Sequence, residues 1–346
     1  MSKGNPELKY YLFGAFFAAI VLVIVLFLIV VWVTSPAFFT DYILSQKGGL
    51  GDAINGITAP FIGVSVAILT FLAFYMQFKA NETHNRQFNE QSLEKEREKH
   101  ENKILYLIKK NRNIAVNMNI GESIKGAKCF TKMFNEYREA YKITNSFYAD
   151  DIKEGALNNK DIINISYLIF YNGVGETSNI LNDSILKNAP RLTVLLSIFH
   201  SAATASENGA ETLKKHYHVD FDHKILSDLN YKPFDGHTTR LGQYFRNLFH
   251  ILSYTYNIPV ELISKLENYE LIKSLRSQLS SYEQILIYFN SLSLYGKPLE
   301  DNGFIEQYHL IKNIPLPLIE FSGDIHDYYN EIDFEWDEII ERANTN

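Results

Sequence analysis

The stretch GHTTRLGQYFRNLFHILSYTY, residues 236–256, predicts one long amphipathic helix. At 100° per residue its large apolar side chains fall on one half of the helical wheel. They are Leu241, Tyr244, Phe245, Leu248, Phe249, Ile251, Leu252 and Tyr256. The opposite half carries Arg246, Asn247 and His250. The apolar half therefore predicts a core helix, and the polar half is either a solvated or packed surface or the wall of a site.

Arg246 and His250 are four positions apart, so they are neighbours on the helix surface. The pattern is similar to that of small α-helical ribonucleases of the HEPN class, which place an Arg and a His on one helix with four to six residues between them. Here RNLFH leaves three residues between them, which departs from that class. Arg246, Asn247 and His250 are thus the catalytic candidates. An arginine can also hold a phosphate or carboxylate without any reaction following.

A second stretch, LRSQLSSYEQILIYFNSLS at residues 275–293, predicts another amphipathic helix from Arg276 to Ser293. On one continuous helix, Arg276 and Glu283 would lie two turns apart. We expect Arg246 to pair with Glu283 across a helix–helix contact. The residues expected to have interface or structural roles are Arg246, Arg276, Gln278, Tyr282 and Glu283.

Metal and cofactor signatures are sparse. The segment KKHYHVDFDH, residues 214–223, offers His216, His218 and His223 as metal-ligand candidates, because His and Asp are ordinary zinc ligands. It lies between helical patterns, where a solvated loop is the simpler reading. The single cysteine, Cys129, excludes an internal disulfide and a Cys-rich zinc module. No GxGxxG, GxxxxGK[ST], GxSxG or HExxH motif occurs, so we predict no cofactor and favour a non-enzymatic protein.

Two uncharged runs near the N-terminus predict a transmembrane hairpin. Tyr10–Val33 has 24 uncharged residues, more than the roughly 20 that a spanning helix needs. It is too long for the apolar region of a signal peptide. The second run, residues 53–78, holds Pro60, which suits the first turn of a helix starting near Thr58. The predicted boundaries are residues 1–9 for the N-terminus, 10–34 and 57–78 for the spans, and 35–56 for the loop.

Basic residues predict the orientation of this hairpin. The N-terminus has two lysines, the loop has one, and the segment after the second span has five basic residues by Lys99. Positive flanks stay in the cytoplasm. We therefore expect a multi-pass protein of the bacterial inner membrane, with both termini cytoplasmic and residues 35–56 forming a short external loop.

The remainder of the chain predicts a helical cytosolic protein. Residues 79–110 form a polar helical connector with sparse apolar heptad positions, which is a solvated helix or a coiled coil. Residues 111–315 show recurrent helical periodicity without strand–helix alternation, so the predicted fold class is all-α. Residues 316–346 form an acidic, aromatic tail. It either packs Tyr328, Phe334 and Trp336 onto the body or acts as a docking segment or regulatory cap.

Three segments together carry a family resemblance. GDAINGITAPFIGVSVAILTFLAFYMQFKAN (51–81), LGQYFRNLFHILSYTY (241–256) and LRSQLSSYEQILIYFNSLS (275–293) resemble the phage abortive infection protein family of the AbiC type. The resemblance runs over roughly residues 10 to 312. It implies two N-terminal spans, a polar connector, a helical cytosolic domain and a role in bacterial anti-phage defence. It supplies no catalytic residues.

We therefore expect a membrane-anchored abortive infection protein whose cytosolic domain senses infection or a partner. Its action would arrest or kill the host cell, and the membrane is one route for that action. Its expected partners are the lipid bilayer, further copies of itself and a phage or host trigger. Nucleic acid is not expected to be a partner, because the net charge of the chain is −7. One alternative is a membrane-tethered HEPN-like ribonuclease using Arg246 and His250, and another is a non-catalytic membrane scaffold.

Overall fold

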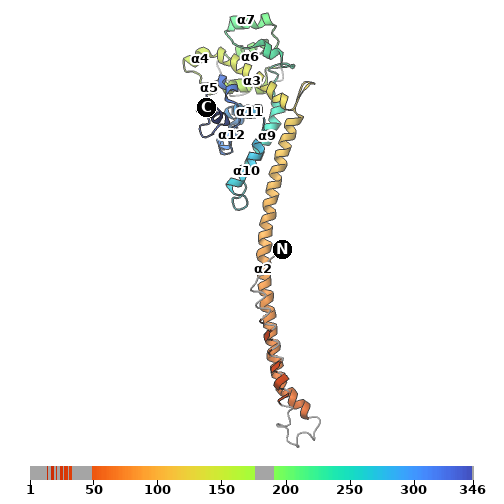
Figure 1. Cartoon of the computed structure of the whole chain (residues 1–346). Helices are drawn as coiled ribbons and strands as arrows, with labels where there is room; N and C mark the ends of the chain where they lie inside the picture. Colours follow the sequence, from red (N-terminus) through yellow and green to blue (C-terminus); the bar gives the residue numbers. More distant parts are fainter. Residues whose placement is uncertain are drawn as a thin grey trace. The chain divides into compact units, whose positions relative to one another are not determined.

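The computed structural model describes residues 49–175 and 191–344, together with individual residues between Gly14 and Trp32. Most of these residues are helical (Figure 1). The only strands among them are β1 (Asn119–Ile120) and β2 (Ile124–Lys125), which form one antiparallel pair. The predicted all-α fold class is therefore confirmed.

The helical elements of the described residues follow in chain order. The α-helices are α2 (Gly49–Asn117), α3 (Ala127–Phe147), α4 (Ala149–Lys153), α5 (Asn159–Asn172), α6 (Leu192–Ala202), α7 (Glu207–Tyr217), α8 (His223–Ser227), α9 (Thr238–Tyr256), α10 (Lys265–Arg276), α11 (Ser281–Leu292), α12 (Lys297–Asp301), α13 (Phe304–Gln307) and α14 (Glu335–Asn344). The 3-10 turns are η3 (Leu294–Gly296), η4 (Leu316–Leu318), η5 (Glu320–Ser322) and η6 (Ile325–Asp327).

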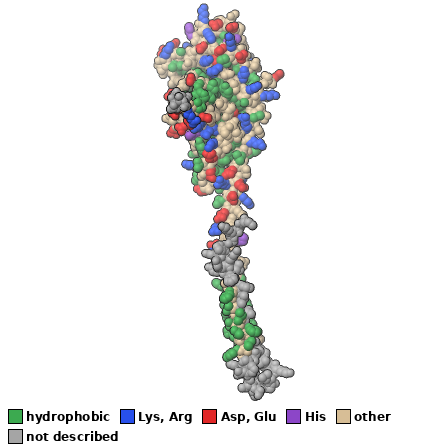
Figure 2. All heavy atoms as spheres, in the orientation of Figure 1, with side chains coloured by type: hydrophobic (Ala, Val, Ile, Leu, Met, Phe, Trp, Pro, Cys, Tyr) green, Lys and Arg blue, Asp and Glu red, His purple; other side chains and the backbone are tan. Residues whose placement is uncertain are grey.

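The chain divides into two compact units, Met1–Leu93 and Glu94–Asn346. In the first unit, α2 exposes a dense set of large apolar side chains, among them Phe61, Val64, Phe71, Phe74 and Phe78. Figure 2 shows hydrophobic side chains gathered along this helix. Within the described chain, only α2, in its stretch Thr58–Asn117, contains an apolar run long enough to cross a membrane.

The two-helix hairpin stays a prediction, because its first helix, residues 10–34, lies largely outside the described residues. The second predicted helix starts earlier than expected. α2 begins at Gly49, so Pro60 lies inside the helix and not in its first turn near Thr58. A proline removes only one N–H donor, and membrane helices tolerate such a position. Residues 49–56 of the predicted loop are therefore helical.

The core of the second unit is a triangle of mutually packed helices, α3, α5 and α11. Tyr137 of α3 is fully buried, and its ring lies 5.7 Å from that of Phe170 in α5 and 4.3 Å from that of Phe289 in α11. Burial of one such aromatic side chain stabilises the fold by about 1.5–3 kcal/mol. Aromatic packing thus joins three helices that are far apart in sequence.

The last turns of α2 belong to this unit. Ile104 is fully buried, and Leu107 and Ile108 are nearly so. The predicted connector, residues 79–110, is therefore part of α2, and its final turns enter the core. Phe88 and Leu93 are exposed, and the predicted coiled coil remains untested.

The predicted single helix from Arg276 to Ser293 is wrong, because α10 ends at Arg276 and α11 begins at Ser281. Ser280 caps α11: its hydroxyl accepts from the Glu283 N–H, and the Glu283 carboxylate accepts from the Ser280 N–H. This reciprocal capping box starts a new helix. The sequence SSYE contains this S-x-x-E capping signal. The apolar periodicity that continues across it favoured a single helix instead.

The C-terminal tail packs onto the body. Phe334 is fully buried, while Tyr328 and Trp336 are half-buried. The Tyr329 hydroxyl lies 2.7 Å from the Ser291 hydroxyl of α11, and the Glu335 N–H donates to the Lys312 carbonyl at 3.0 Å. Of the residues predicted as the tail, 316–346, the described ones form 3-10 turns followed by α14.

Candidate functional site: the cavity beside α9

A cavity of about 600 Å³ lies beside α9. This volume is within the range of small-ligand sites. Helices α5, α9, α11 and α12 and the η3 turn line it, through Tyr171, Thr238, Gly242, Phe245, Arg246, Phe249, Asn290, Tyr295, Pro298 and Leu299. Its wall is mainly aromatic and apolar, with one guanidinium group.

The amphipathic pattern of α9 places these side chains. Leu241, Leu248 and Leu252 are fully buried and hold the helix against the core. Phe245 and Arg246 then fall at the edge of the buried face, because each successive residue turns about 100° around the axis. The edge of α9 therefore supplies both an apolar surface and a positive charge.

Gly242 creates room between two polar groups. A Cβ atom there would lie 2.9 Å from the Tyr171 hydroxyl and 3.3 Å from Nη1 of Arg246. The Tyr171 hydroxyl and the Arg246 guanidinium thus approach the same glycine from two elements. Burial raises the pKa of Tyr171, and the nearby Arg246 charge partly opposes that rise. Tyr171 therefore stays a neutral hydrogen-bond donor at physiological pH.

Tyrosine rings form one wall. The Tyr171 and Tyr295 rings are 4.7 Å apart, and on its other side Tyr171 stacks on Tyr167 at 5.9 Å. The Tyr295 hydroxyl donates to Asn172 at 3.1 Å. These contacts fix the position of the Tyr171 ring.

The structure separates the three catalytic candidates. Arg246 lines the cavity. Asn247 is buried, and its amide donates to the Leu107 carbonyl at 3.3 Å and to Asn111 at 3.2 Å, which joins α9 to α2. His250 is exposed, and its ring lies 6.2 Å from that of Tyr254. Asn247 is therefore a packing contact and not part of the exposed face that Arg246 and His250 share.

The expected Arg246–Glu283 pair does not form. Glu283 is buried and pairs with Arg112 of α2 at 3.6 Å, and the Tyr244 hydroxyl donates to it at 3.1 Å. Tyr244 precedes Arg246 by two residues, so the two side chains leave α9 about 200° apart. Arg112, and not Arg246, is therefore the arginine that pairs with Glu283.

The other expected interface residues have local structural roles. Nη1 of Arg276 donates to the carbonyls of Tyr308 and His309, each at 3.2 Å. Gln278 donates to the Ser274 carbonyl at 3.1 Å. The Tyr282 ring lies 5.5 Å from the Phe134 ring, where it packs against the core.

The histidine candidates for metal binding are dispersed. His216 is in the last turn of α7, and His218 is its left-handed C-cap. Nε2 of His223 lies 2.8 Å from the Ala205 carbonyl oxygen. In the part of the chain that the structure describes, no group of three or more His, Cys, Asp or Glu side chains is placed to hold a metal ion.

Sequence reasoning missed a buried polar cluster around Glu136 of α3. Its fully buried carboxylate accepts from the Tyr231 hydroxyl at 2.5 Å and the Phe234 N–H at 2.8 Å, and it lies 3.0 Å from Nε2 of His237. The signal was present in MFNEYREAY, because Glu136 lies on the same helix face as Met133 and Ala140. A carboxylate on a buried stripe indicates a satisfied polar cluster.

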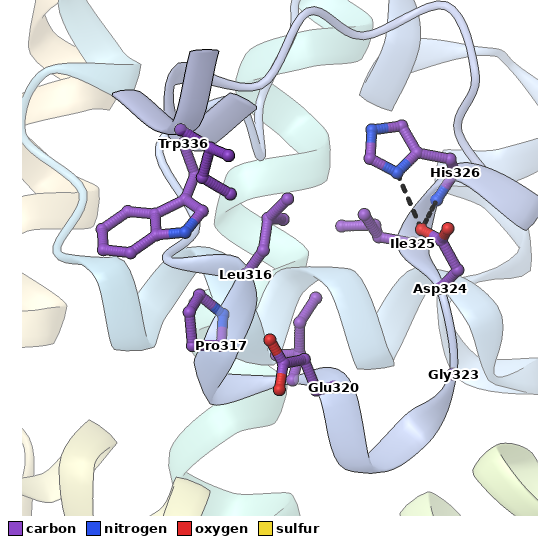
Figure 3. Close-up of a pocket in the computed structure, with 10 residues that line it drawn as sticks. Leu316, Pro317, Glu320, Gly323, Asp324, Ile325, His326 and Trp336 are labelled. Atoms are coloured by element: carbon purple, nitrogen blue, oxygen red, sulfur yellow. Dashed lines mark hydrogen bonds and ion pairs between the residues drawn. The ribbon is translucent and has the colours of Figure 1, made fainter. Parts of the chain in front are cut away.

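A second pocket, of about 480 Å³, is built by the C-terminal segment. Figure 3 shows Trp336, Leu316 and Pro317 on one side of it, and His326 beside Asp324 on the other. Nδ1 of His326 lies 2.7 Å from Asp324, and Nε2 lies 3.0 Å from Asp337 of α14. The imidazole therefore bridges the η6 turn and α14.

This bridge predicts a pH-dependent attachment of α14. Hydrogen bonding to Asp324 raises the pKa of His326 above 6.5, and hydrogen bonds from His326 lower the pKa of Asp324 below 3.8. The charged His326 imidazolium thus stabilises the attachment of α14 fully below about pH 6.5. This stabilisation is lost as pH rises through the raised pKa of His326. The Asp324 contribution is lost as pH falls through the lowered pKa. Attachment should be strongest between these limits.

Trp336 provides the measurement. In a Trp32→Phe background, quenching of its fluorescence by acrylamide should increase between pH 6 and 8.5. The added substitution His326→Gln should make the quenching independent of pH over this interval. An unchanged pH profile in that variant would show that His326 does not control α14.

The fold and the cavity together define a class: a helical domain with a small-ligand-sized cavity beside α9, in a chain that carries a membrane-length apolar helix. The family is indicated by a direct match. Residues 236–318 match the model of the family described as "Putative phage abortive infection protein". The match confirms, for this segment, the resemblance that the motifs indicate. No curated protein and no solved structure matches the chain.

Proposed function

We propose that this chain is a membrane-anchored protein of bacterial anti-phage defence. Its helical domain senses infection or a partner on the cytoplasmic side of the inner membrane. On sensing, several copies act together on the bilayer and arrest or kill the host cell. The match of residues 236–318 to the phage abortive infection family supports the defence role.

The observation that carries the membrane part of the proposal is the apolar surface of α2. Phe71, Phe74 and Phe78 are each about two-thirds exposed, at 69%, 65% and 70%. A soluble protein rarely leaves such a continuous apolar surface in water, whereas a bilayer covers it. Ser65 donates to the Phe61 carbonyl at 2.5 Å, so its hydroxyl is satisfied within the helix.

Self-association is the simplest route to toxicity. The two predicted spans carry no charged side chain that could line a pore in a single copy. Several copies together can perturb the bilayer, and small residues such as Gly63 and Ala67 allow close helix approach. The proposed partners are therefore the lipid bilayer, further copies of the chain and a phage or host trigger.

The test measures membrane potential and RNA integrity in one phage-infected bacterial culture that expresses the chain. We expect the potential to collapse before lysis while RNA stays intact. Leu69→Arg places a charge in the middle of the apolar segment, which costs about 2.5–3.5 kcal/mol for insertion. This variant should lose membrane localisation and protection. Phe88→Arg, at an exposed position of the polar part of α2, is the matched control and should keep both.

Two other outcomes identify the alternative functions. RNA cleavage before any change in potential would overturn the membrane effector and favour the tethered ribonuclease, with Arg246 and His250 as the first residues to substitute. Equal protection by Leu69→Arg and the unaltered chain would exclude a role of the second span. Absence of toxicity on overproduction, with one tightly co-purifying protein, would indicate the scaffold.

A further inference from the structure

We propose that the cavity beside α9 binds a free nucleoside phosphate, with the phosphate at Arg246 and Tyr171 and the base against the aromatic wall. This inference rests on the geometry of the cavity and is independent of the membrane function. Its failure would therefore leave that function untouched.

Arg246 and Tyr171 supply a pair of unused hydrogen-bond donors. Among the described residues, the Arg246 guanidinium has no carboxylate partner and the Tyr171 hydroxyl has no hydrogen-bond partner. By contrast, Arg112 pairs with the Glu283 carboxylate, and Arg276 donates to two backbone carbonyls. Both unused groups flank Gly242, where a Cβ atom would lie 2.9 and 3.3 Å from them. Two donors that lie beside the same glycine, at the wall of the cavity, are close enough to bind one oxyanion together.

Aromatic rings form the wall around these donors. The rings of Tyr171, Tyr295, Phe245 and Phe249 line the cavity. Tyr171 and Tyr295 are held 4.7 Å apart, and the Phe249 ring lies 5.9 Å from Phe304. Stacking of a base on an aromatic side chain contributes about 1–3 kcal/mol. An inorganic anion would leave this apolar wall unoccupied.

The volume of the cavity and the net charge of the chain also favour a nucleotide. A volume of about 600 Å³ holds a ligand with both a ring and an anionic group. Arginine is the side chain best suited to bind a phosphate through two parallel hydrogen bonds. The chain has a net charge of −7, which disfavours a long polyanion and favours a free nucleotide.

The matched family segment contributes most of this cavity. Nine of its ten lining residues lie within residues 236–318, and only Tyr171 lies outside. The two donors therefore come together only because α5 packs beside α9. Gly173 and Gly236 allow this packing, because their backbones lie in close contact. The site is complete in one copy of the chain.

The experiment is calorimetric titration of the full chain in detergent with the four ribonucleoside monophosphates. At least one should bind, and both its nucleoside and inorganic phosphate should bind at least about 10-fold more weakly. Arg246→Gln should weaken binding at least about 10-fold, because it removes a charge-assisted contact. Tyr171→Phe should weaken binding about 2- to 10-fold, because it removes a neutral hydrogen bond. His250→Ala, an exposed position on the same helix, should change binding less than about 2-fold.

Three results would overturn the proposal: no binding by any monophosphate, unchanged affinity in Arg246→Gln, or equal binding by inorganic phosphate alone. Tighter binding of a 5′-phosphorylated ten-nucleotide strand than of the monophosphate would also overturn it, because the ligand would then be a strand end. Arg246 is exposed, so Arg246→Gln should keep the melting temperature of the unaltered chain. Unchanged melting assigns its loss of affinity to the site.

Discussion

Substitution of Glu136 by Ala should lower the stability of the helical unit by about 3–5 kcal/mol. Three groups lose their acceptor at once: the Tyr231 hydroxyl, the Phe234 N–H and the His237 ring. Both Glu136 and His237 are almost completely buried, so water cannot replace the lost contacts. Thermal unfolding of the full chain in detergent, followed by near-ultraviolet circular dichroism, should show a melting temperature lower by about 10 °C or more.

The control for this prediction is Glu154→Ala, at the exposed C-cap of α4. It should change the melting temperature by less than about 2 °C, because exposed substitutions cost about 0.5 kcal/mol or less. Glu136→Gln should fall between the two variants, since an amide oxygen still accepts some of the bonds. Equal melting of Glu136→Ala and Glu154→Ala would show that the cluster does not stabilise the fold.

Substitution of Gly236 by Ala should cost about 4 kcal/mol or more. The Gly236 backbone has φ of +88°, and a Cβ atom would lie 2.6 Å from the Asn172 carbonyl oxygen. The close approach is fixed by backbone hydrogen bonds on either side, from the Val174 N–H to Phe234 at 2.9 Å and from the His237 N–H to Tyr171 at 2.8 Å. The backbone cannot relax without breaking them, so strain and steric overlap add.

Gly155→Ala separates the two effects. Gly155 has φ of +74°, and nothing lies within 4 Å of an added Cβ atom. That variant should therefore show only the conformational cost, about 1–2 kcal/mol. The measurement is thermal unfolding together with resistance to limited proteolysis. Equal losses in both variants would mean that the contact between the end of α5 and the start of α9 is not tight.

The candidate site was predictable in part. The amphipathic pattern around Arg246 indicated a helix with a polar edge, and α9 runs over Thr238–Tyr256 as that pattern requires. The pattern made Asn247 and His250 catalytic candidates equal to Arg246, because a helical wheel contains no information about neighbouring helices. The approach of α2 buries Asn247, and the approach of α5 brings Tyr171 to Arg246.

The ion-pair partner of each charged residue was the least predictable feature of the structure. The expected Arg246–Glu283 pair does not form, because Glu283 pairs with Arg112. A charged side chain can pair with any opposite charge that packing places within a few ångströms. The chain contains many such charges, so the sequence does not show which two will pair. The break between α10 and α11 was different, because the capping signal Ser280-x-x-Glu283 was local and readable.

By itself the sequence determined the properties that depend on neighbours along the chain. These are the all-α class, the apolar run in α2, the amphipathic face of α9 and the motif segment that matches the abortive infection family. Helical periodicity, span length and capping act within a few turns, so a linear pattern encodes them. Only the tertiary structure decided the cavity at Arg246, the cluster at Glu136 and the partner of Glu283. Each of these joins residues from helices distant in sequence, and packing alone sets which of them meet.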